Sequence, residues 1–443
     1  MPAPSRVGPR ARSGEPFGGA PYRLLRLMEE RFADVFCYRL TGPDGRRQLL
    51  LAVLDEVRTV TEHGPLPPAR LAGALDEAQC AADAAAAGEP FVGDVVFALS
   101  HDLQWSLRPP ELPAAPAAAR PRDPLAVLAR IGSAAVYDET GGMPRTHGRH
   151  AEELLDLARG CAAPAGSDLP PGPGEPLTRV VSGLDADRYA RQLALARRYF
   201  DKGDVYQAVI SVQVRVRPYA PVHTYFATIA GRYDSATYAY WLSAAGTRIF
   251  GACSLPHVTV AGDRMATRVF AGTAGADDGS GAEIRRLRED PKYFSEHVML
   301  VDLERNDIGA LALPGRVRVE RLLRPLVIGP TTYLATDVLG DLPPGTGLGA
   351  CLLGTFPRGV VVGAPKLRAQ EVVAEIEERP RGFYSGALGI YRAATREVVS
   401  NTIVTCGEAD GDETVLSCGG GVTNESTAEQ ELSELDLKLA YLR

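Results

Sequence analysis

The chain lacks the features that mark several large classes of protein. Its 443 residues contain no run of about 18 apolar residues, so no membrane-spanning helix is expected. Its seven cysteines show no CxxC spacing, which argues against a thiol–metal motif and favours reduced thiols in the cytoplasm. A formal net charge of −7, without any basic stripe studded with aromatic residues, argues against a nucleic-acid partner.

The chain also lacks a secretory signal and a dinucleotide-binding fingerprint. Residues 1–19 are rich in proline, glycine and arginine and lack the apolar segment of a secretory signal, so a disordered tail is expected there. The glycine-rich stretch 345–349 is not a dinucleotide fingerprint, because no strand precedes it and its spacing is wrong. What the chain does contain is 45% hydrophobic residues, enough for a large core.

Composition divides the chain into four parts. We expect a disordered tail at 1–20, an N-terminal region at 21–160, a linker rich in proline and glycine at 161–178, and a C-terminal region at 179–443. Helical and alternating patterns both occur, which predicts an α/β (α+β) fold. Strands are predicted at 46–57, 91–99, 205–216, 247–260, 265–271, 316–323, 382–393 and 398–406, and helices at 68–87, 151–159, 185–202 and 427–442.

Acidic residues gather in two helical segments that are far apart in the sequence. Asp290 and Pro291 form a good helix start, and the helix that follows carries Glu296. Near the C-terminus, Glu431, Glu434 and Lys438 are spaced by three and four residues and so share one helical face. Two such helices can converge on one hard cation that holds a carboxylate substrate. The plain alternative is a solvated acidic helix end.

Seven short segments, in order, carry a resemblance to a known family. They are 203–207 (GDVYQ), 270–273 (FAGT), 296–309 (EHVMLVDLERNDIG), 356–357 (FP), 363–366 (GAPK), 382–386 (GFYSG) and 419–421 (GGG). With these segments the C-terminal region resembles the chorismate-utilising enzymes, which include anthranilate synthase component I, aminodeoxychorismate synthase, isochorismate synthase and salicylate synthase. The N-terminal region matches less well and lacks a clear Leu-Leu-Glu-Ser motif, so feedback by tryptophan is not predicted.

The resemblance implies a fold, a metal and a partner set. The fold would be one large α/β unit, in which two mostly antiparallel sheets pack face to face with helices outside and the active site lies between the sheets. Mg²⁺ would be held by Glu296 and Glu434, with Glu431 close by, and would bridge to the carboxylate of a chorismate-like substrate.

The resemblance also implies substrate-binding residues. Lys438 would hold a carboxylate as a point charge, and three consecutive glycines would let backbone N–H groups approach it. The alternatives are a surface lysine and a plain turn, and for Tyr384 the alternative is core packing. The full set of candidate substrate-binding residues is Lys438, Tyr384, Gly419, Gly420, Gly421, Thr273, Ala271, Thr405 and Lys366, of which Lys366 has an equally good structural reading.

Two positions bear on which reaction is possible. Isochorismate and salicylate synthases carry a water-activating lysine at the position of Gln207, and glutamine is no general base. Aminodeoxychorismate synthases often carry a nucleophilic lysine at the position of Ala271, and alanine supplies no amine. Addition of ammonia to the ring carbon, as in anthranilate or 2-amino-2-deoxyisochorismate formation, is the remaining pattern.

Several positions depart from the family pattern. Leu255 replaces a glutamate that acts as acid or base, and His257, expected on the same strand face, is a possible substitute, although a bystander role is the alternative. Tyr333 replaces a histidine and Val404 an arginine that clamps the substrate carboxylate. Val360 and Val362 replace hydroxyl residues. The catalytic candidates are therefore His257, Tyr333 and Gln207, in a drier, more apolar pocket.

These observations predict a Mg²⁺-dependent enzyme that acts on chorismate or a chorismate-like carboxylate in specialised metabolism, with anthranilate synthase component I as the nearest activity. The chain shows no cysteine-nucleophile elbow of a glutaminase, so ammonia is expected from solution or from a separate glutaminase subunit. Two alternatives stay open. One is a divergent enzyme with another substrate or reaction, and the other is a non-catalytic partner of a true synthase.

Overall fold

The computed structural model describes residues 19–443 with short gaps, and the statements below refer to these residues. The gaps are 42–45, 63–66, 86–87, 109–110, 139–141, 162–175, 233–236, 276–280, 329–330, 441 and 443. The predicted tail and most of the predicted linker lie outside the described residues. No helix in the described part is both long enough and apolar enough to cross a membrane.

Eighteen strands form the framework, and every pairing between them is antiparallel. They are β1 (Val35–Thr41), β2 (Arg47–Val60), β3 (Val95–Leu99), β4 (Ala126–Asp138), β5 (Arg145–Gly148), β6 (Thr178–Ser182), β7 (Gln207–Pro218), β8 (Tyr238–Ala244), β9 (Thr247–Cys253), β10 (Pro256–Ala261), β11 (Arg264–Gly275), β12 (Val317–Ile328), β13 (Thr331–Asp341), β14 (Gly363–Ala364), β15 (Ala387–Arg392), β16 (Glu397–Thr402), β17 (Cys406–Asp410) and β18 (Glu413–Val422).

Hydrogen bonds link these strands into one continuous network. Followed from one end, the order is β6, β7, β18, β17, β9, β8, β1, β2, β4, β3, β15, β16, β10, β11, β13 and β12, with β5 beside β4 and β14 beside β7. The predicted class, α/β with mostly antiparallel strands and outer helices, is confirmed. The expected pair of separate sheets is replaced by a single network, because β1 joins β8 and β3 joins β15 across the two halves of the chain.

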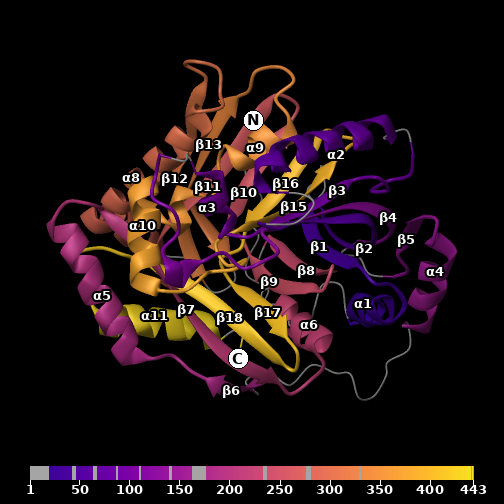
Figure 1. Ribbon diagram of the computed structural model, residues 1–443, viewed down its shortest axis with the longest axis horizontal. Coiled ribbons are helices and arrows are strands. Elements are labelled where there is room, and N and C mark those ends of the chain that lie inside the picture. Colours follow the sequence, from indigo (N-terminus) through magenta and orange to yellow (C-terminus); the bar gives the residue numbers. More distant parts are fainter. Residues whose placement is uncertain are drawn as a thin grey trace.

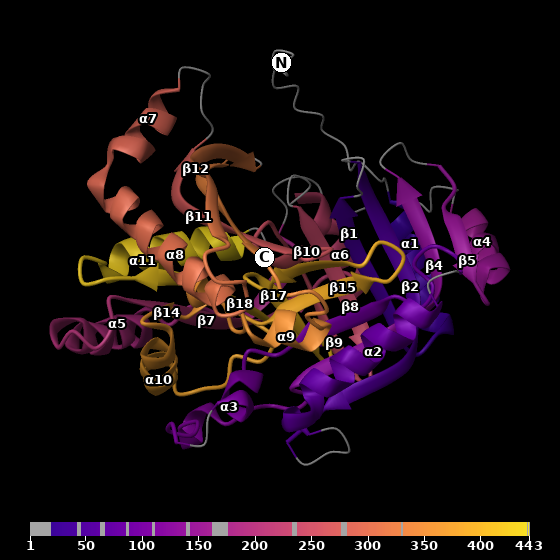
Figure 2. The same ribbon diagram turned by 90° about the horizontal axis from the view of Figure 1, so that it is seen from above.

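Helices cover the outside of this network (Figures 1 and 2). They are α1 (Ala20–Arg31), α2 (Leu71–Ala85), α3 (Leu103–Leu107), α4 (Ala151–Gly160), α5 (Ala186–Asp201), α6 (Val222–Arg232), α7 (Ala282–Glu289), α8 (Pro291–Gly309), α9 (Leu348–Leu353), α10 (Lys366–Glu377) and α11 (Ala428–Ala440), with short 3-10 turns at Pro68–Arg70, Ala117–Ala119 and Gly359–Val361. The acidic helix α11 packs beside α5 and against β18 (Figure 1).

Local sequence signals explain several of these boundaries. Helix α5 begins after Asp185, whose side chain accepts a hydrogen bond from the backbone N–H of Arg188, as an N-cap residue does. Helix α8 begins at Pro291, as the Asp-Pro pair predicts. The apolar alternation in β7 places Val214 and Val216 in the core, where they lie among buried residues of α5, α6 and α11.

Several strand predictions need correction. The segment 91–99 is a strand only from Val95, and the segment 398–406 runs from β16 across a break at 403–405 to the first residue of β17. The segment 247–260 is two strands, because the chain leaves β9 at Ser254 and enters β10 at Pro256, a residue that suits a first strand position since it has no N–H to donate. In the segment 382–393 only β15 is a strand. The preceding residues form a loop in which Gly382 and Ser385 have positive φ angles of 63° and 65°, conformations that interrupt a strand.

Candidate active site

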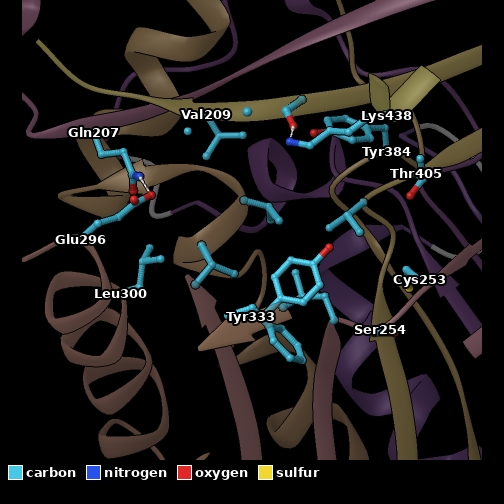
Figure 3. A pocket seen from close by; sticks show the side chains of 18 of the residues that line it. Gln207, Val209, Cys253, Ser254, Glu296, Leu300, Tyr333, Tyr384, Thr405 and Lys438 are labelled. Carbon is cyan, nitrogen blue, oxygen red and sulfur yellow. Dashed lines mark hydrogen bonds between the residues drawn. The ribbon is translucent and has the colours of Figure 1, made fainter. Parts of the chain in front are cut away.

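A pocket of about 350 Å³ opens where β7 and β18 face α8, β11 and β13 (Figure 3). Its lining residues are Gln207, Val209, Ala252, Cys253, Ser254, Leu255, Phe270, Glu296, Leu300, Tyr333, Val360, Val361, Tyr384, Val404, Thr405, Gly419, Gly420, Gly421 and Lys438. Residues from both ends of the C-terminal region therefore meet in one cavity. A volume of this size suits a small organic ligand.

The three glycines form one wall of the pocket. They continue β18 beyond the last residue that pairs with β17, while their other edge stays paired with β7. A Cβ at Gly419 would lie 2.3 Å from the hydroxyl of Tyr384, and a Cβ at Gly421 would lie 2.6 Å from Nε2 of Gln207. Side chains at these two positions would fill the space that the pocket occupies, so glycine is required for close approach to the strand.

A lysine reaches the glycine edge from α11. Nζ of Lys438 donates to the carbonyl oxygen of Gly419 at 3.0 Å (Figure 3). The same ammonium pairs with Glu434 at 2.7 Å. Consecutive residues of a strand direct their N–H and C=O groups to opposite edges, so Gly421, two residues after Gly419, turns its backbone polar groups to the same edge as Gly419. A backbone edge with an ammonium beside it is suited to an anionic ligand group.

A buried amide faces a carboxylate on the opposite side of the pocket. Nε2 of Gln207 donates to Oε1 of Glu296 at 3.2 Å, and the Gln207 residue is only 2% exposed (Figure 3). Oε1 of Gln207 is buried and accepts no hydrogen bond from the described residues. An acceptor held in this way is available to a ligand donor, because leaving it unsatisfied is unfavourable.

Glu296, Glu431 and Glu434 are the candidate ligands for Mg²⁺. Among the described residues, no three His, Cys, Asp or Glu side chains converge closely enough to hold an ion by themselves. Glu296 lines the pocket, and Oε2 of Glu431 would lie 3.4 Å from a Cβ at Gly420, whereas the Glu434 side chain is 56% exposed and paired with Lys438. Neither Glu431 nor Glu434 lines the pocket. Mg²⁺ takes one or two carboxylates and completes its shell with water and substrate oxygens, so Glu296 in the pocket, with Glu431 and Glu434 on the neighbouring helix α11, fits such a shell.

Two tyrosines border the cavity. Tyr384 is buried, and burial raises the pKa of its phenol well above the usual value, so it stays protonated and acts as a hydrogen-bonding group. Tyr333 lies on β13 with its ring edge-on to Phe270, at a centroid distance of 5.9 Å. Both predicted residues therefore lie in the pocket, although on different walls (Figure 3).

Most of the apolar replacements gather on one part of the lining. Leu255, Val360 and Val404 all line the pocket, whereas Val362 does not. Thr405, next to Val404, turns its hydroxyl toward the carbonyl of Ala252 at 3.4 Å. This part of the pocket offers few polar partners to a ligand.

Four predicted site residues lie outside the lining, namely His257, Lys366, Glu431 and Glu434. His257 is buried, and its Nε2 lies 3.0 Å from the hydroxyl of Thr355. Burial, followed by the positive charges of Arg358 and Lys366, lowers the pKa of this imidazole to about 3, so the ring is neutral at physiological pH. Lys366 pairs with Asp307 at 2.7 Å, which favours its structural reading.

The reason for the misplaced histidine is local. Leu255 precedes β10, and the register of β10 against β16 shifts between Pro256 and Thr259, so the strand alternation that was to put His257 beside Leu255 does not hold. The side-chain predictions at Ala271 and Thr273 lie outside the described residues.

Sequence reasoning missed part of the lining. Leu300 follows Glu296 by one helical turn on α8, and this spacing alone would have indicated a shared face. Cys253, the last residue of β9, and Ser254, which follows it, gave no such signal. Burial raises the pKa of the Cys253 thiol to about 12, so the thiol is not a nucleophile at neutral pH.

An antiparallel α/β fold, with a pocket that combines a glycine edge, an ammonium and a carboxylate, is suited to a small polar ligand. The profile of the family described as chorismate binding enzyme matches residues 37–443. The chain belongs to this family.

Individual relatives agree with the assignment. The chain is 34% identical over 290 residues to anthranilate synthase component 1 of Streptomyces coelicolor, an alignment that covers 63% of this chain and 56% of that protein. It is 33% identical over 224 residues to 2-amino-4-deoxychorismate synthase of Streptomyces globisporus, covering 50% of this chain and 45% of that protein. The chain thus spans about half the length of these curated relatives.

Solved structures share the fold. Anthranilate synthase component I from Streptococcus pneumoniae superposes with a TM-score of 0.74 at 20% identity, covering 99% of this chain and 100% of that one. The menaquinone-specific isochorismate synthase from Escherichia coli superposes with a TM-score of 0.67 at 16% identity, covering 95% and 90%. At these identities the likeness shows the fold.

Proposed function

We propose that the chain is a Mg²⁺-dependent enzyme that acts on chorismate or a chorismate-like carboxylate, nearest to the anthranilate and 2-amino-2-deoxyisochorismate synthases. The observation that carries the proposal is the placement of the Gly419 edge and Lys438 opposite Gln207 and Glu296 in one pocket. Family membership supplies the substrate class.

Each group has a role that its chemistry allows. Lys438 and the backbone N–H of Gly421 bind a substrate carboxylate, and Gln207 orients Glu296 and offers its free amide oxygen to a substrate hydroxyl. Tyr333 offers its phenol O–H as a hydrogen-bond donor to the ligand. Glu296 would hold Mg²⁺ together with Glu431 or Glu434 of α11, and the ion would supply positive charge to the bound carboxylate.

The nature of the lining favours amination over hydration. No lysine lies at the position of Gln207, and the described lining offers no imidazole to activate water. Ammonia is a stronger nucleophile than water and can form the C–N bond without prior deprotonation, after which the ammonium group releases a proton to solvent. Its source would be free ammonium or a separate glutaminase subunit, and the setting would be specialised metabolism in the cytoplasm.

The test is consumption of chorismate by the purified chain with Mg²⁺ and ammonium, followed by mass spectrometry of the product. Glu296→Gln and Glu431→Gln should each lower kcat/KM by at least about tenfold, because each removes a charged oxygen from the metal. Glu429→Gln, an exposed glutamate on the same helix α11 and outside the lining, is the matched control. Intact chorismate with both ammonium and glutamine plus a glutaminase would refute the aminating activity.

The apolar side of the pocket favours one variation on this function. Leu255, Val360 and Val404 would meet an apolar part of a ligand better than a second carboxylate. A divergent substrate with one polar group fewer is therefore the second candidate. The double variant Leu255→Glu with Val404→Arg distinguishes chorismate from a divergent substrate. If this variant forms anthranilate from chorismate and the parent chain does not, the parent acts on a different substrate with the same fold and pocket.

A further inference from the structure

A second cavity, of about 270 Å³, lies along β7 beyond the first pocket. It is lined by Arg122, Ser182, Gly183, Leu184, Asp185, Arg188, Tyr189, Gln192, Ser211, Val212, Gln213, Arg215, Arg379 and Val415. Gln207 and Val209 face the first pocket, and Ser211 and Gln213 continue the same alternate positions of β7 into the second cavity. The start of α5, the end of β6 and the segment after α10 close it, in the lower left of Figure 1.

The lining of this cavity is strongly positive in a chain that is negative overall. Four arginines line it against one carboxylate, that of Asp185, whereas the chain has a formal net charge of −7. The carboxylate is already engaged as the cap of α5, where it accepts from the N–H of Arg188 at 2.8 Å. Positive charges gathered in one concave space attract an anion.

The deepest of the four arginines is Arg379. Its Nη2 donates to the backbone oxygen and the hydroxyl of Ser211 at 2.8 and 2.9 Å, while its Nη1 is buried without a hydrogen-bond partner among the described residues. Burial lowers the pKa of this guanidinium below its usual value, although the charge of Glu377 acts in the opposite sense. A desolvated cation with an unused donor is stabilised by an anion beside it.

The other arginines are placed around it on separate elements. Arg188, in the first turn of α5, donates to the backbone oxygen of Glu377 at 2.8 Å, and Arg122 reaches the cavity from the segment before β4. Arg215 is partly neutralised by Asp410 and Glu413, at 3.2 and 3.4 Å. Hence Arg122, Arg188 and Arg379 carry most of the uncompensated charge, and the N-terminus of the 16-residue helix α5 adds to it.

We propose that this cavity is a second ligand site, which binds a small polar dianion of the phosphate monoester type. Guanidinium groups that arrive from three different elements match the several oxygens of a tetrahedral phosphoryl group, and planar bidentate pairing with phosphate is the chemistry arginine favours. The remaining lining, Ser182, Gln192 and Gln213, offers neutral hydrogen-bonding groups to the polar body of the ligand.

A buried ion pair separates the two cavities. Arg381 and Glu377 meet at 2.7 Å, and Arg381 also donates to the backbone oxygens of Val209 and Val361, which line the first pocket. On the other side Glu377 accepts from the N–H of Ser211, which lines the second cavity. The two cavities do not share a lining, so a substitution in one of them should leave ligand binding in the other unchanged.

Calorimetric titration of the purified chain with inorganic phosphate, glycerol 3-phosphate and malate, in chloride at matched ionic strength, tests the site. We expect one saturable site for glycerol 3-phosphate and weaker binding of malate. Gln213→Glu should abolish this binding, because the new carboxylate repels the anion. Arg122→Gln should weaken it by about tenfold, because one charge-assisted contact is lost. Both positions are half-buried or exposed, so the fold tolerates them.

Matched controls assign the binding to this cavity. Arg191→Gln makes the same charge change on an exposed face of α5, and Lys438→Gln does so in the first pocket, so both should bind glycerol 3-phosphate like the parent. Loss of binding in Lys438→Gln would move the anion to the first pocket. The proposal also fails when no probe saturates, when Gln213→Glu and Arg122→Gln bind like the parent, or when malate binds as tightly as the phosphate ester.

Discussion

Replacement of Glu377 by glutamine should destabilise the protein strongly. Both partners of the Glu377–Arg381 pair are buried, with side chains 1% and 3% exposed. Arg381 donates to both carboxylate oxygens at 2.7 and 3.0 Å, and Glu377 also accepts from the N–H of Ser211 at 2.7 Å. The amide keeps the volume but leaves the Arg381 guanidinium buried without a counter-charge.

The expected loss is about 3–5 kcal/mol in the free energy of unfolding, the range for removal of one partner from a buried pair. An exposed pair with the same i,i+4 spacing provides the control. Arg26 and Glu30 on α1 lie 3.8 Å apart with side chains 34% and 64% exposed, and Glu30→Gln should cost less than about 1 kcal/mol. The difference between the two variants isolates the effect of burial.

Urea denaturation followed by circular dichroism measures both variants, and a pH series adds a second check. Burial acts to raise the pKa of Glu377, but the charges of Arg381 and Arg379 outweigh it and the net pKa lies below the usual value. The stabilisation is therefore present above about pH 4.5 and is lost as the pH falls below it. A cost for Glu377→Gln within about 1 kcal/mol of that for Glu30→Gln at pH 7 would refute the reasoning.

Three further predictions follow from the same structure. Burial raises the pKa of Glu408 to about 7, so the folded state holds a proton that the unfolded state releases, and stability should fall by up to about 3 kcal/mol between pH 4 and 8. Glu408→Gln should flatten this slope in thermal unfolding, and an unchanged slope would contradict it. Gly419→Ala should lower stability by about 1–3 kcal/mol, because its Cβ would lie 2.3 Å from the Tyr384 hydroxyl, whereas Gly420→Ala, with its nearest contact at 3.4 Å, should stay within about 0.5 kcal/mol. Equal melting temperatures for the two alanine variants would count against this close packing. Lys438→Gln should raise KM for chorismate by about tenfold in steady-state assays of the proposed activity, because a charged partner of the carboxylate is lost, and an unchanged KM would remove Lys438 from the substrate.

The elements predicted best are those whose signals are local. The helix start at Asp185, the Asp290–Pro291 start of α8 and the shared helical face of Glu434 and Lys438 depend on residues within one helical turn, and all three are found in the structure. The order of the strands depends on partners far apart in the sequence. Pairing of β3 with β15 joins residues nearly three hundred positions apart, as in Leu99 with Ala387, and periodicity carries no information about such a partner.

The site residues also differ in how well the sequence predicts them. The family segments correctly brought Glu296, Gln207 and Tyr384 into one pocket, because motif residues are recognised one at a time. The role of His257 was inferred from alternation across a turn, where alternation fails. The arginine cavity gave no sequence signal, since its members come from five separate segments and only their common exposure to one space makes them a group.

The pairing of β1 with β8 and of β3 with β15 has a consequence for how the polypeptide can be divided. Each of these junctions joins a strand from before residue 160 to one from after residue 179. If the regions 21–160 and 179–443 were produced as separate polypeptides, each would have unpaired, apolar edge strands and would tend to self-associate. Coexpressed, the same two pieces have complementary margins and should reconstitute a nicked but native particle, which makes this chain a natural scaffold for a split reporter.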